Sequence, residues 1–549
     1  MDSAAPGPAV DAHQTDQPPA NLREHVREAL FGPDATVSPL LLFGGAVTIV
    51  AGVVLRFWAP SPLWLDEVIS VNIARLPVSQ IPHALSHDGA PPLYYMLLHY
   101  WMDAFGTGDL AVRALSGILS VASLPLLWMA GRRVGGRTVA WVTLFLGVTS
   151  PFAINYATAT RMYSLMILLS VLGYLALQRA IEVPSRGRLA ALSAVTAALL
   201  YTHYWGLYLV LVTAIWLAWL ERRTGRGRQV LRAVGGGALL WLPWSPVFAY
   251  QALHTGTPWT SAASAGDLLG LFGDYAGPGS WGMLLMFATF ALFLVGVFGR
   301  TAAPGTIVRV TDSDGTTHEA QSGPAVVIEL RPRPGMAALV AVAFGTLIVA
   351  VVLGAIANAA FVARYTAVVL PLFLLVVAAG IAVIPGRRFR VGCIAVLCLS
   401  GVLTGYGENR QQRTQASQVA AVLNAQAVSG DVVVYCPDQL GPAVDRLLKV
   451  PGVVELTFPR AIGPQRVNWV DYRKVAAATD VETFAQAVLA RAAIGRTVWL
   501  VWRDGYPGLG GDCGYLQHWL DLLRSSGPTV VHQNGSVFYE YENLVRYGA

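Results

Sequence analysis

The sequence predicts a polytopic α-helical membrane protein with an α/β domain at its C-terminal end. Of its 549 residues, 54% are hydrophobic and only 13% are charged, whereas soluble domains carry roughly 25% charged residues. Apolar runs recur up to residue 407, most of them near the ~20 residues that a membrane-spanning helix needs. Beyond that point, short apolar runs alternate with amphipathic ones, which is typical of α/β domains.

The first segment, residues 1–38, is polar and contains no short apolar core. This composition predicts a disordered cytoplasmic tail and argues against a signal peptide.

Residues 39–407 form the predicted transmembrane domain, with about eleven spans. The runs lie near 39–58, 110–130, 138–155, 162–180, 189–205, 206–220, 230–249, 282–299, 337–356, 363–384 and 390–407. A weaker run at 92–105 is shorter and starts at two prolines. If this run does not cross, most arginines fall in loops on one side, which the positive-inside rule assigns to the cytoplasm. We therefore expect 92–106 to lie along the membrane surface.

This topology places the first loop, residues 59–109, outside the cytoplasm and makes residues 301–336 a cytoplasmic insertion. In the insertion, "TIVRV" and "HEA" flank a turn-rich centre, which indicates a β-hairpin or, equally, a poorly ordered loop.

Residues 408–549 form the predicted extracytoplasmic α/β domain. The expected strands are "DVVVYC", "TVWLVWRDG" and "SVFYEYEN", and the expected helices are "LGPAVDRLLK", "VETFAQAVLARAA" and "YLQHWLDLLRSS". Cys436 and Cys513 could form a disulfide or remain free thiols. The domain has no glycine-rich phosphate loop and no CxxC or HExxH metal spacing. A packing or acceptor-binding module is the simplest interpretation.

The net charge of +6 does not indicate nucleic-acid binding, because the arginines lie in short loops and form no basic stripe. Only two lysines occur, while Ala and Gly are abundant. Such composition is typical of a GC-rich bacterial genome, and we expect an actinobacterial source.

The first loop concentrates ionisable side chains in a chain that has few of them. Asp66, Glu67, His83, His87 and Asp88 all lie there. Asp66 could simply cap a helix that starts nearby, but the concentration favours a functional site.

Two arginines, Arg161 and Arg364, start spans on the same predicted outer side. Each could snorkel to lipid headgroups. A guanidinium also suits phosphate, because its planar fork donates two parallel hydrogen bonds. We favour a phosphate-bearing lipid ligand, which His203 in the turn "YTHYWG" could help to orient.

The order of several motifs resembles that of GT-C membrane glycosyltransferases. The motifs are "WLDE", "PPLYY", "VRALSG", "SPFAINYATATRMYSL", "YTHYWG" and "ARYTAVVLP", within residues 40–405. The chain is most similar to the branch of protein O-mannosyltransferases and the lipid A aminoarabinose transferase. This resemblance implies a GT-C fold, a polyprenyl-phosphate sugar donor, an acceptor outside the cytoplasmic membrane and transfer with inversion.

The resemblance also implies roles for individual residues. Asp66, Glu67 and Asp88 are the expected catalytic residues; Arg161, Arg364 and His203 are expected at the donor phosphate, and Tyr94, Tyr95, Tyr163 and Tyr365 are expected to position substrate. Relatives often carry a glutamate where this chain has Ala159, so the chain departs from them there. No metal is required, although the carboxylates could hold a divalent cation.

The sequence therefore predicts an enzyme that moves a sugar to a cell-envelope glycan or lipoglycan. Mannose is the first choice of sugar and arabinofuranose the second. The competing class is a lipid-linked sugar transporter or flippase, which would show broken helices and repeated halves. A non-catalytic scaffold for envelope assembly is the third class. Membrane lipids are expected partners, and nucleic acid is not.

Overall fold

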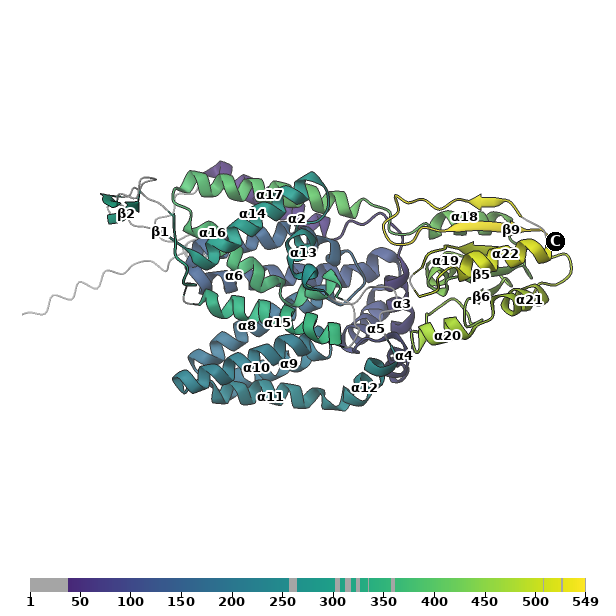
Figure 1. Cartoon of the computed structure of the whole chain (residues 1–549), viewed down its shortest axis with the longest axis horizontal. Helices are drawn as coiled ribbons and strands as arrows, with labels where there is room; N and C mark the ends of the chain where they lie inside the picture. The colour runs from purple at the N-terminus through teal and green to yellow at the C-terminus, as the bar shows by residue number, and fades with distance from the viewer. Residues whose placement is uncertain are drawn as a thin grey trace, which may run out of the picture. The chain divides into compact units, whose positions relative to one another are not determined.

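The computed structural model describes residues 38–548, apart from 256–263, 302–306, 312–316, 322–325, 334, 357–360, 507 and 525–526. Except for Ser38, the predicted N-terminal tail lies outside the described residues. Figure 1 shows the helices of the first part of the chain, in purple to green, and a yellow region built around a sheet.

Helices make up nearly all of the regular structure before residue 410. They are α2 (Pro39–Leu55), α3 (Leu65–Ala74), α4 (Ile81–Asp88), α5 (Leu93–Phe105), α6 (Asp109–Thr149), α7 (Pro151–Ala157), α8 (Tyr163–Glu182), α9 (Arg186–Leu200), α10 (Trp205–Thr224), α11 (Arg228–Trp241), α12 (Ser245–His254), α13 (Ala265–Ala276), α14 (Gly279–Phe298), α15 (Met336–Ile356), α16 (Leu370–Val383) and α17 (Arg387–Asn409). Short 3-10 helices are η1 (Val78–Gln80), η2 (Leu242–Trp244) and η3 (Ala363–Val368).

Every predicted apolar run overlaps at least one of these helices. Among the described residues, six helices are long and apolar enough to cross a membrane: α6, α8, α10, α14, α15 and α17. The apolar helices α2 and α16 are shorter. The chain is therefore a polytopic helical membrane protein, while the count of eleven spans stays a prediction.

Glycine marks a kink between two predicted runs, and proline interrupts a third run. Helix α6 covers two predicted spans and is kinked at Gly135 and Gly136, where Gly136 has a φ of 74°. The prediction of one helix over 230–249 is wrong in detail, because α11 ends at Trp241 and η2 and α12 follow. Pro243 and Pro246 lie at these junctions, and proline supplies no amide hydrogen to the helix ladder.

The first loop contains α3, η1, α4 and α5. Helix α5 covers nearly all of the predicted surface segment 92–106 and ends where Gly106 adopts a φ of 83°. In residues 301–336 the structure has the hairpin rather than an irregular loop. Strand β2 (Ile307–Thr311) pairs antiparallel with β3 (Thr317–Gln321), beside a second pair of β1 (Gly299–Thr301) and β4 (Val326–Ile328).

The chain after residue 410 contains a five-stranded mixed sheet in the order β6-β5-β7-β9-β8. The strands are β5 (Val432–Cys436), β6 (Val454–Thr457), β7 (Val498–Trp502), β8 (Thr529–Val531) and β9 (Asn543–Tyr547), and the helices are α18 (Ala416–Gln426), α19 (Gly441–Asp445), α20 (Tyr472–Ala478), α21 (Val481–Arg491) and α22 (Asp512–Arg524). Strands β6, β5 and β7 are parallel, and β9 runs antiparallel to β7 and β8.

Helices cover both faces of this sheet, which explains why β5 is an unbroken apolar run. Successive strand residues point to opposite faces. Val433 and Tyr435 belong to the core formed with α18 and α19, whereas Val432 and Val434 pack in the core that includes α20, α21 and α22. Continuous apolar strands are typical of sheets buried on both sides.

The prediction of a closing strand at 536–543 is wrong, because β9 begins only at Asn543. Residues 538–540 instead bond to the segment before α18, where the amides of Phe538 and Glu540 donate to the carbonyls of Gln412 and Arg413. Cys436 and Cys513 form a disulfide with a Cα–Cα distance of 5.4 Å. Of the two alternatives left open by the sequence, a disulfide or two free thiols, the structure therefore has the disulfide.

Candidate active site

Asp66 and two arginines meet at the start of α3. The Asp66 Oδ2 atom lies 3.3 Å from Arg364 Nη1 and 4.0 Å from Arg161 Nε. Asp66 comes from the first turn of α3, Arg161 from the turn between α7 and α8, and Arg364 from η3. The structure thus brings together three predicted residues from three distant segments of the chain.

This cluster is buried but incompletely hydrogen-bonded. Within the described residues, Asp66 Oδ2, Arg161 Nε and Arg364 Nε have no hydrogen-bond partner. The side chains are only 13–16% exposed. Buried polar groups in native proteins nearly always form hydrogen bonds, so three atoms that meet only through loose ion pairs mark a place for a polar ligand. Two guanidinium groups suit a phosphate there.

Asp88 joins the cluster through Tyr95. The Tyr95 hydroxyl donates to Asp88 Oδ2 at 3.0 Å and accepts from Arg161 Nη1 at 3.3 Å. Burial raises the pKa of Asp88, although Arg161 and the Tyr95 hydrogen bond partly oppose this. Tyr95 is therefore the direct link between the second carboxylate of the first loop and the arginine pair.

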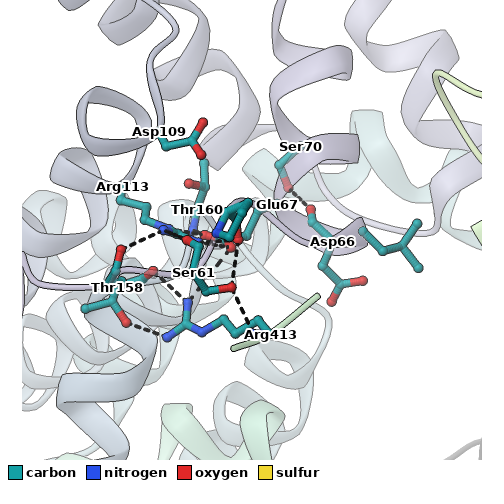
Figure 2. A network of polar contacts seen from close by, with 12 residues as sticks. Ser61, Asp66, Glu67, Ser70, Asp109, Arg113, Thr158, Thr160 and Arg413 are labelled. Carbon is teal, nitrogen blue, oxygen red and sulfur yellow. Dashed lines mark hydrogen bonds and ion pairs between the residues drawn. The ribbon is translucent and has the colours of Figure 1, made fainter. Parts of the chain in front are cut away.

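Glu67, in contrast, is fully enclosed by arginines. Arg113 Nε and Nη2 donate to its two oxygens at 2.8 and 2.6 Å, and Arg413 Nη1 lies 3.9 Å away. Burial would raise the pKa of Glu67, but Arg113 and Arg413 hold it below its usual value. In Figure 2 both guanidinium groups approach Glu67, and the Asp66 carboxylate points away from it. This geometry makes Glu67 a positioning residue for the start of α3.

 Ala159 is itself buried, 7% exposed, between two threonines. The Thr160 amide donates to Glu67 Oε1 at 2.9 Å, and Arg413 donates to the Thr158 hydroxyl at 2.6 Å and to its carbonyl at 2.9 Å. The segment around Ala159 is therefore tied to the Glu67 network.

His203 lies beside the arginines and is held neutral. Burial, together with the charges of Arg161 and Arg364, lowers the pKa of His203 to about 3. Its Nδ1 accepts from the Trp205 amide at 3.2 Å. A neutral imidazole that accepts at Nδ1 carries its proton on Nε2, so His203 can donate one hydrogen bond.

Aromatic rings surround His203 and Arg364. The rings of Tyr365 and Tyr163 have centroids 4.7 and 6.3 Å from that of His203, and the Arg364 guanidinium lies 5.8 Å from the Tyr365 ring. The Tyr163 hydroxyl is buried and has no hydrogen-bond partner among the described residues. Both tyrosines therefore lie beside His203, while their role in positioning substrate stays a prediction.

Tyr94 plays a different part from its neighbour Tyr95. It is fully buried, and its hydroxyl lies 3.0 Å from Ser116 Oγ, which donates to the Arg161 carbonyl at 3.2 Å. Tyr94 thus supports the turn that carries Arg161 and does not reach the cluster directly.

The chain after residue 410 also contributes to the site, which the sequence analysis missed. Glu540 Oε1 accepts from the Leu65 amide at 2.9 Å, at the first turn of α3. Tyr539 stacks on Trp64 with ring centroids 3.9 Å apart. Burial, with smaller contributions from Asp66 and Glu67, raises the pKa of Glu540 to about 8. The one available signal was a pair of glutamates among aromatic residues in "FYEYE".

An apolar cavity of about 770 Å³ lies between α8, α9, α10 and α15. Its lining includes Leu199, whose carbonyl accepts from the His203 amide, and Val368 of η3. The cavity therefore adjoins the segments that carry His203 and Arg364.

The carboxylates and imidazoles do not gather into a metal site. Among the described residues, no group of three or more His, Cys, Asp or Glu side chains could hold a metal ion. The polar cluster at Asp66 is instead dominated by arginine.

Comparison with known proteins identifies the fold. No protein-family model matches the chain, and no curated protein matches it in sequence. The crystal structure of ArnT from Cupriavidus metallidurans bound to undecaprenyl phosphate is similar, with a TM-score of 0.57 and 14% identity over 94% of this chain and 99% of that chain. The apo structure of that ArnT gives the same TM-score and identity over 92% and 98%. The chain thus shares the overall fold of this ArnT.

Proposed function

We propose that this protein is a membrane glycosyltransferase that moves a sugar from a polyprenyl-phosphate donor to an acceptor hydroxyl, with inversion at the anomeric carbon. The observation that carries the proposal is the convergence of Arg161 and Arg364 on Asp66, where each of the three side chains has a buried polar atom without a hydrogen bond. The apolar cavity beside η3 offers room for part of a lipid chain.

The donor phosphate takes the place of Asp66 as the partner of the two arginines. Charge develops on this phosphate as the bond from the anomeric carbon to its oxygen breaks, and preorganised cations stabilise such charge. The Nε2–H of His203 can donate a further hydrogen bond to the same group. The leaving group therefore needs no general acid.

Asp66, released from the arginines, acts as the general base. The acceptor hydroxyl attacks the anomeric carbon, and its proton passes to the Asp66 carboxylate, which requires a separation of about 3 Å. The transition state is oxocarbenium-like, as in other glycosyl transfers. Asp88 binds hydroxyl groups beside the reacting centre, and Glu67 fixes the start of α3.

The reaction takes place on the outer side of the cytoplasmic membrane. Two observations support this orientation: the arginine-rich loops would then lie in the cytoplasm, and the Cys436–Cys513 disulfide would lie in an oxidising compartment. The sheet-containing region, residues 408–549, is then extracytoplasmic. We propose mannose as the sugar, arabinofuranose as the alternative, and a cell-envelope glycan or lipoglycan as the acceptor.

A purified-enzyme assay tests the proposal. The full-length protein in detergent is incubated with a cell-envelope lipoglycan as acceptor and with polyprenyl-phosphate donors that carry labelled mannose, arabinofuranose or glucose. Transfer of the label to the acceptor and release of polyprenyl phosphate are both followed. We expect one of the three sugars to be transferred much faster than the other two. If no donor released polyprenyl phosphate and the protein moved intact donor across liposome membranes, the protein would be a transporter and the proposed enzymatic function would be wrong.

A further inference from the structure

A second cavity, of about 350 Å³, lies between the first loop and residues 462–468. Its lining includes Ile69 and Ile73 of α3 and His83, His87 and Asp88 of α4. Pockets that bind small ligands span roughly 300–1,000 Å³, so this cavity has room for a terminal sugar unit of a larger molecule.

Hydrogen bonds hold the two walls of this cavity together. Asn72 Nδ2 donates to the Gln465 carbonyl at 2.7 Å, and the Trp469 amide donates to the His87 carbonyl at 3.1 Å. The cavity is therefore a built feature of the contact between the first loop and the chain after residue 410.

Asp88 connects this cavity to the candidate active site. It lines the cavity, and its Oδ2 accepts from Tyr95, whose hydroxyl also contacts Arg161. A hydroxyl group bound by Asp88 in the cavity would thus be linked through Tyr95 to Arg161, one of the residues assigned to the donor phosphate.

The lining combines apolar side chains with hydrogen-bonding side chains, and a sugar ring can contact both kinds. Ile69 and Ile73 are four residues apart on α3 and so share a helix face, which can pack against the C–H face of a ring. His83 and Asn468 offer hydrogen-bonding groups for hydroxyls. Arg466 is exposed, and in the described part of the chain its guanidinium makes no hydrogen bond or ion pair. That leaves it available to an anionic group.

We propose that this cavity binds the acceptor, and that the acceptor is a glycan with a phosphate or carboxylate group near the hydroxyl that receives the sugar. This inference rests on the proposed function and names its acceptor class. The donor occupies the arginine cluster, and Asp88 lies between the two binding sites.

Direct binding tests the inference without relying on turnover. The probes are an octyl dimannoside, the same compound with a 6-phosphate, and the same compound with a uronic acid, each titrated into the full-length protein loaded with polyprenyl phosphate. We expect both anionic probes to bind more tightly than the neutral one. Arg466→Gln should weaken binding of the anionic probes roughly fivefold, as expected for an exposed ion pair, and leave binding of the neutral probe unchanged. Lys449→Gln is the matched control, because Lys449 is exposed and does not line the cavity.

A cavity-filling variant provides the second measurement. Ala84 lines the cavity, so Ala84→Phe should weaken all three probes while the affinity for polyprenyl phosphate stays the same. Equal binding of neutral and anionic probes, or unchanged binding by Arg466→Gln, would overturn the inference. The inference would also be overturned if a serine-containing peptide bound more tightly than any of the glycan probes. A loss of affinity for polyprenyl phosphate in Ala84→Phe would overturn it as well. Failure of the proposed function is separate: it would appear as absence of donor cleavage by the wild-type protein.

Discussion

Glu540 links the chain after residue 410 to the helix that carries Asp66, and this link can be broken selectively. Its Oε1 accepts from the Leu65 amide at 2.9 Å, and Leu65 is only 6% exposed. Glu540→Ala leaves that buried donor without a partner, which costs about 1–3 kcal/mol. We expect the free energy of unfolding to fall by that amount, and kcat to fall because the first turn of α3 is no longer held. Glu540→Gln keeps a carbonyl acceptor and should keep most of the activity.

The pH dependence of stability has a definite sign. Burial raises the pKa of Glu540 from 4.5 to about 8. Between those two values Glu540 is more protonated in the folded protein than in the unfolded chain, so its contribution to stability falls as pH rises through this window. The melting temperature in detergent should therefore fall between about pH 5 and pH 8, and this fall should be smaller in Glu540→Gln.

The assay combines kcat and KM for donor cleavage with thermal melting. Glu542→Gln is the matched control, because Glu542 is also buried, 1% exposed, but bonds through its amide to Gln415 rather than to α3. The control should keep kcat whatever its effect on stability. If Glu540→Ala kept its kcat, or if Glu540→Gln lost as much activity as Glu540→Ala, the link to α3 would be refuted.

Three further predictions follow from individual contacts. Arg161→Ala should weaken polyprenyl-phosphate binding about tenfold, the loss of a charge-assisted hydrogen bond; unchanged affinity in a titration would return Arg161 to lipid snorkelling. Arg113→Met should lower the free energy of unfolding by about 3–5 kcal/mol, because it leaves Glu67 without its bidentate partner; a loss below about 1 kcal/mol in thermal melting would contradict this. In the unfolded protein, two of the four cysteines should react with a maleimide before reduction and all four after it; four reactive thiols without reductant would exclude the disulfide.

The positions of the membrane helices were predictable because long apolar runs carry their own signal. The details depended on single residues. Gly136 allows the kink in α6 through its positive φ, and Pro243 with Pro246 separates α11 from α12. The segment 536–542 was mistaken for a strand because its residues alternate in polarity, whereas Tyr539 and Glu540 contact α3 and its flank instead. Local pattern does not reveal such long-range contacts.

The candidate site was predictable only in part. Asp66 was predicted from the ionisable side chains of the first loop, and Arg161 and Arg364 from their position at the predicted outer side. The structure brings both arginines within 4.0 Å of Asp66. The partners of Glu67 were not found, since Arg113 is 46 residues away in the sequence and nothing local joins the two. An arginine inside an apolar helix usually pairs with an acidic residue. The position of Arg113 in such a run could therefore have predicted an acidic partner.

The most direct test of the central claim is the activity of Asp66→Asn with the preferred donor, measured together with its affinity for polyprenyl phosphate. The substitution keeps the size of the side chain and removes the base. We predict that sugar transfer falls at least a hundredfold, while polyprenyl phosphate binds at least as tightly as to the wild type, because Asp66 no longer competes for Arg161 and Arg364. Near-normal transfer by Asp66→Asn would contradict the account.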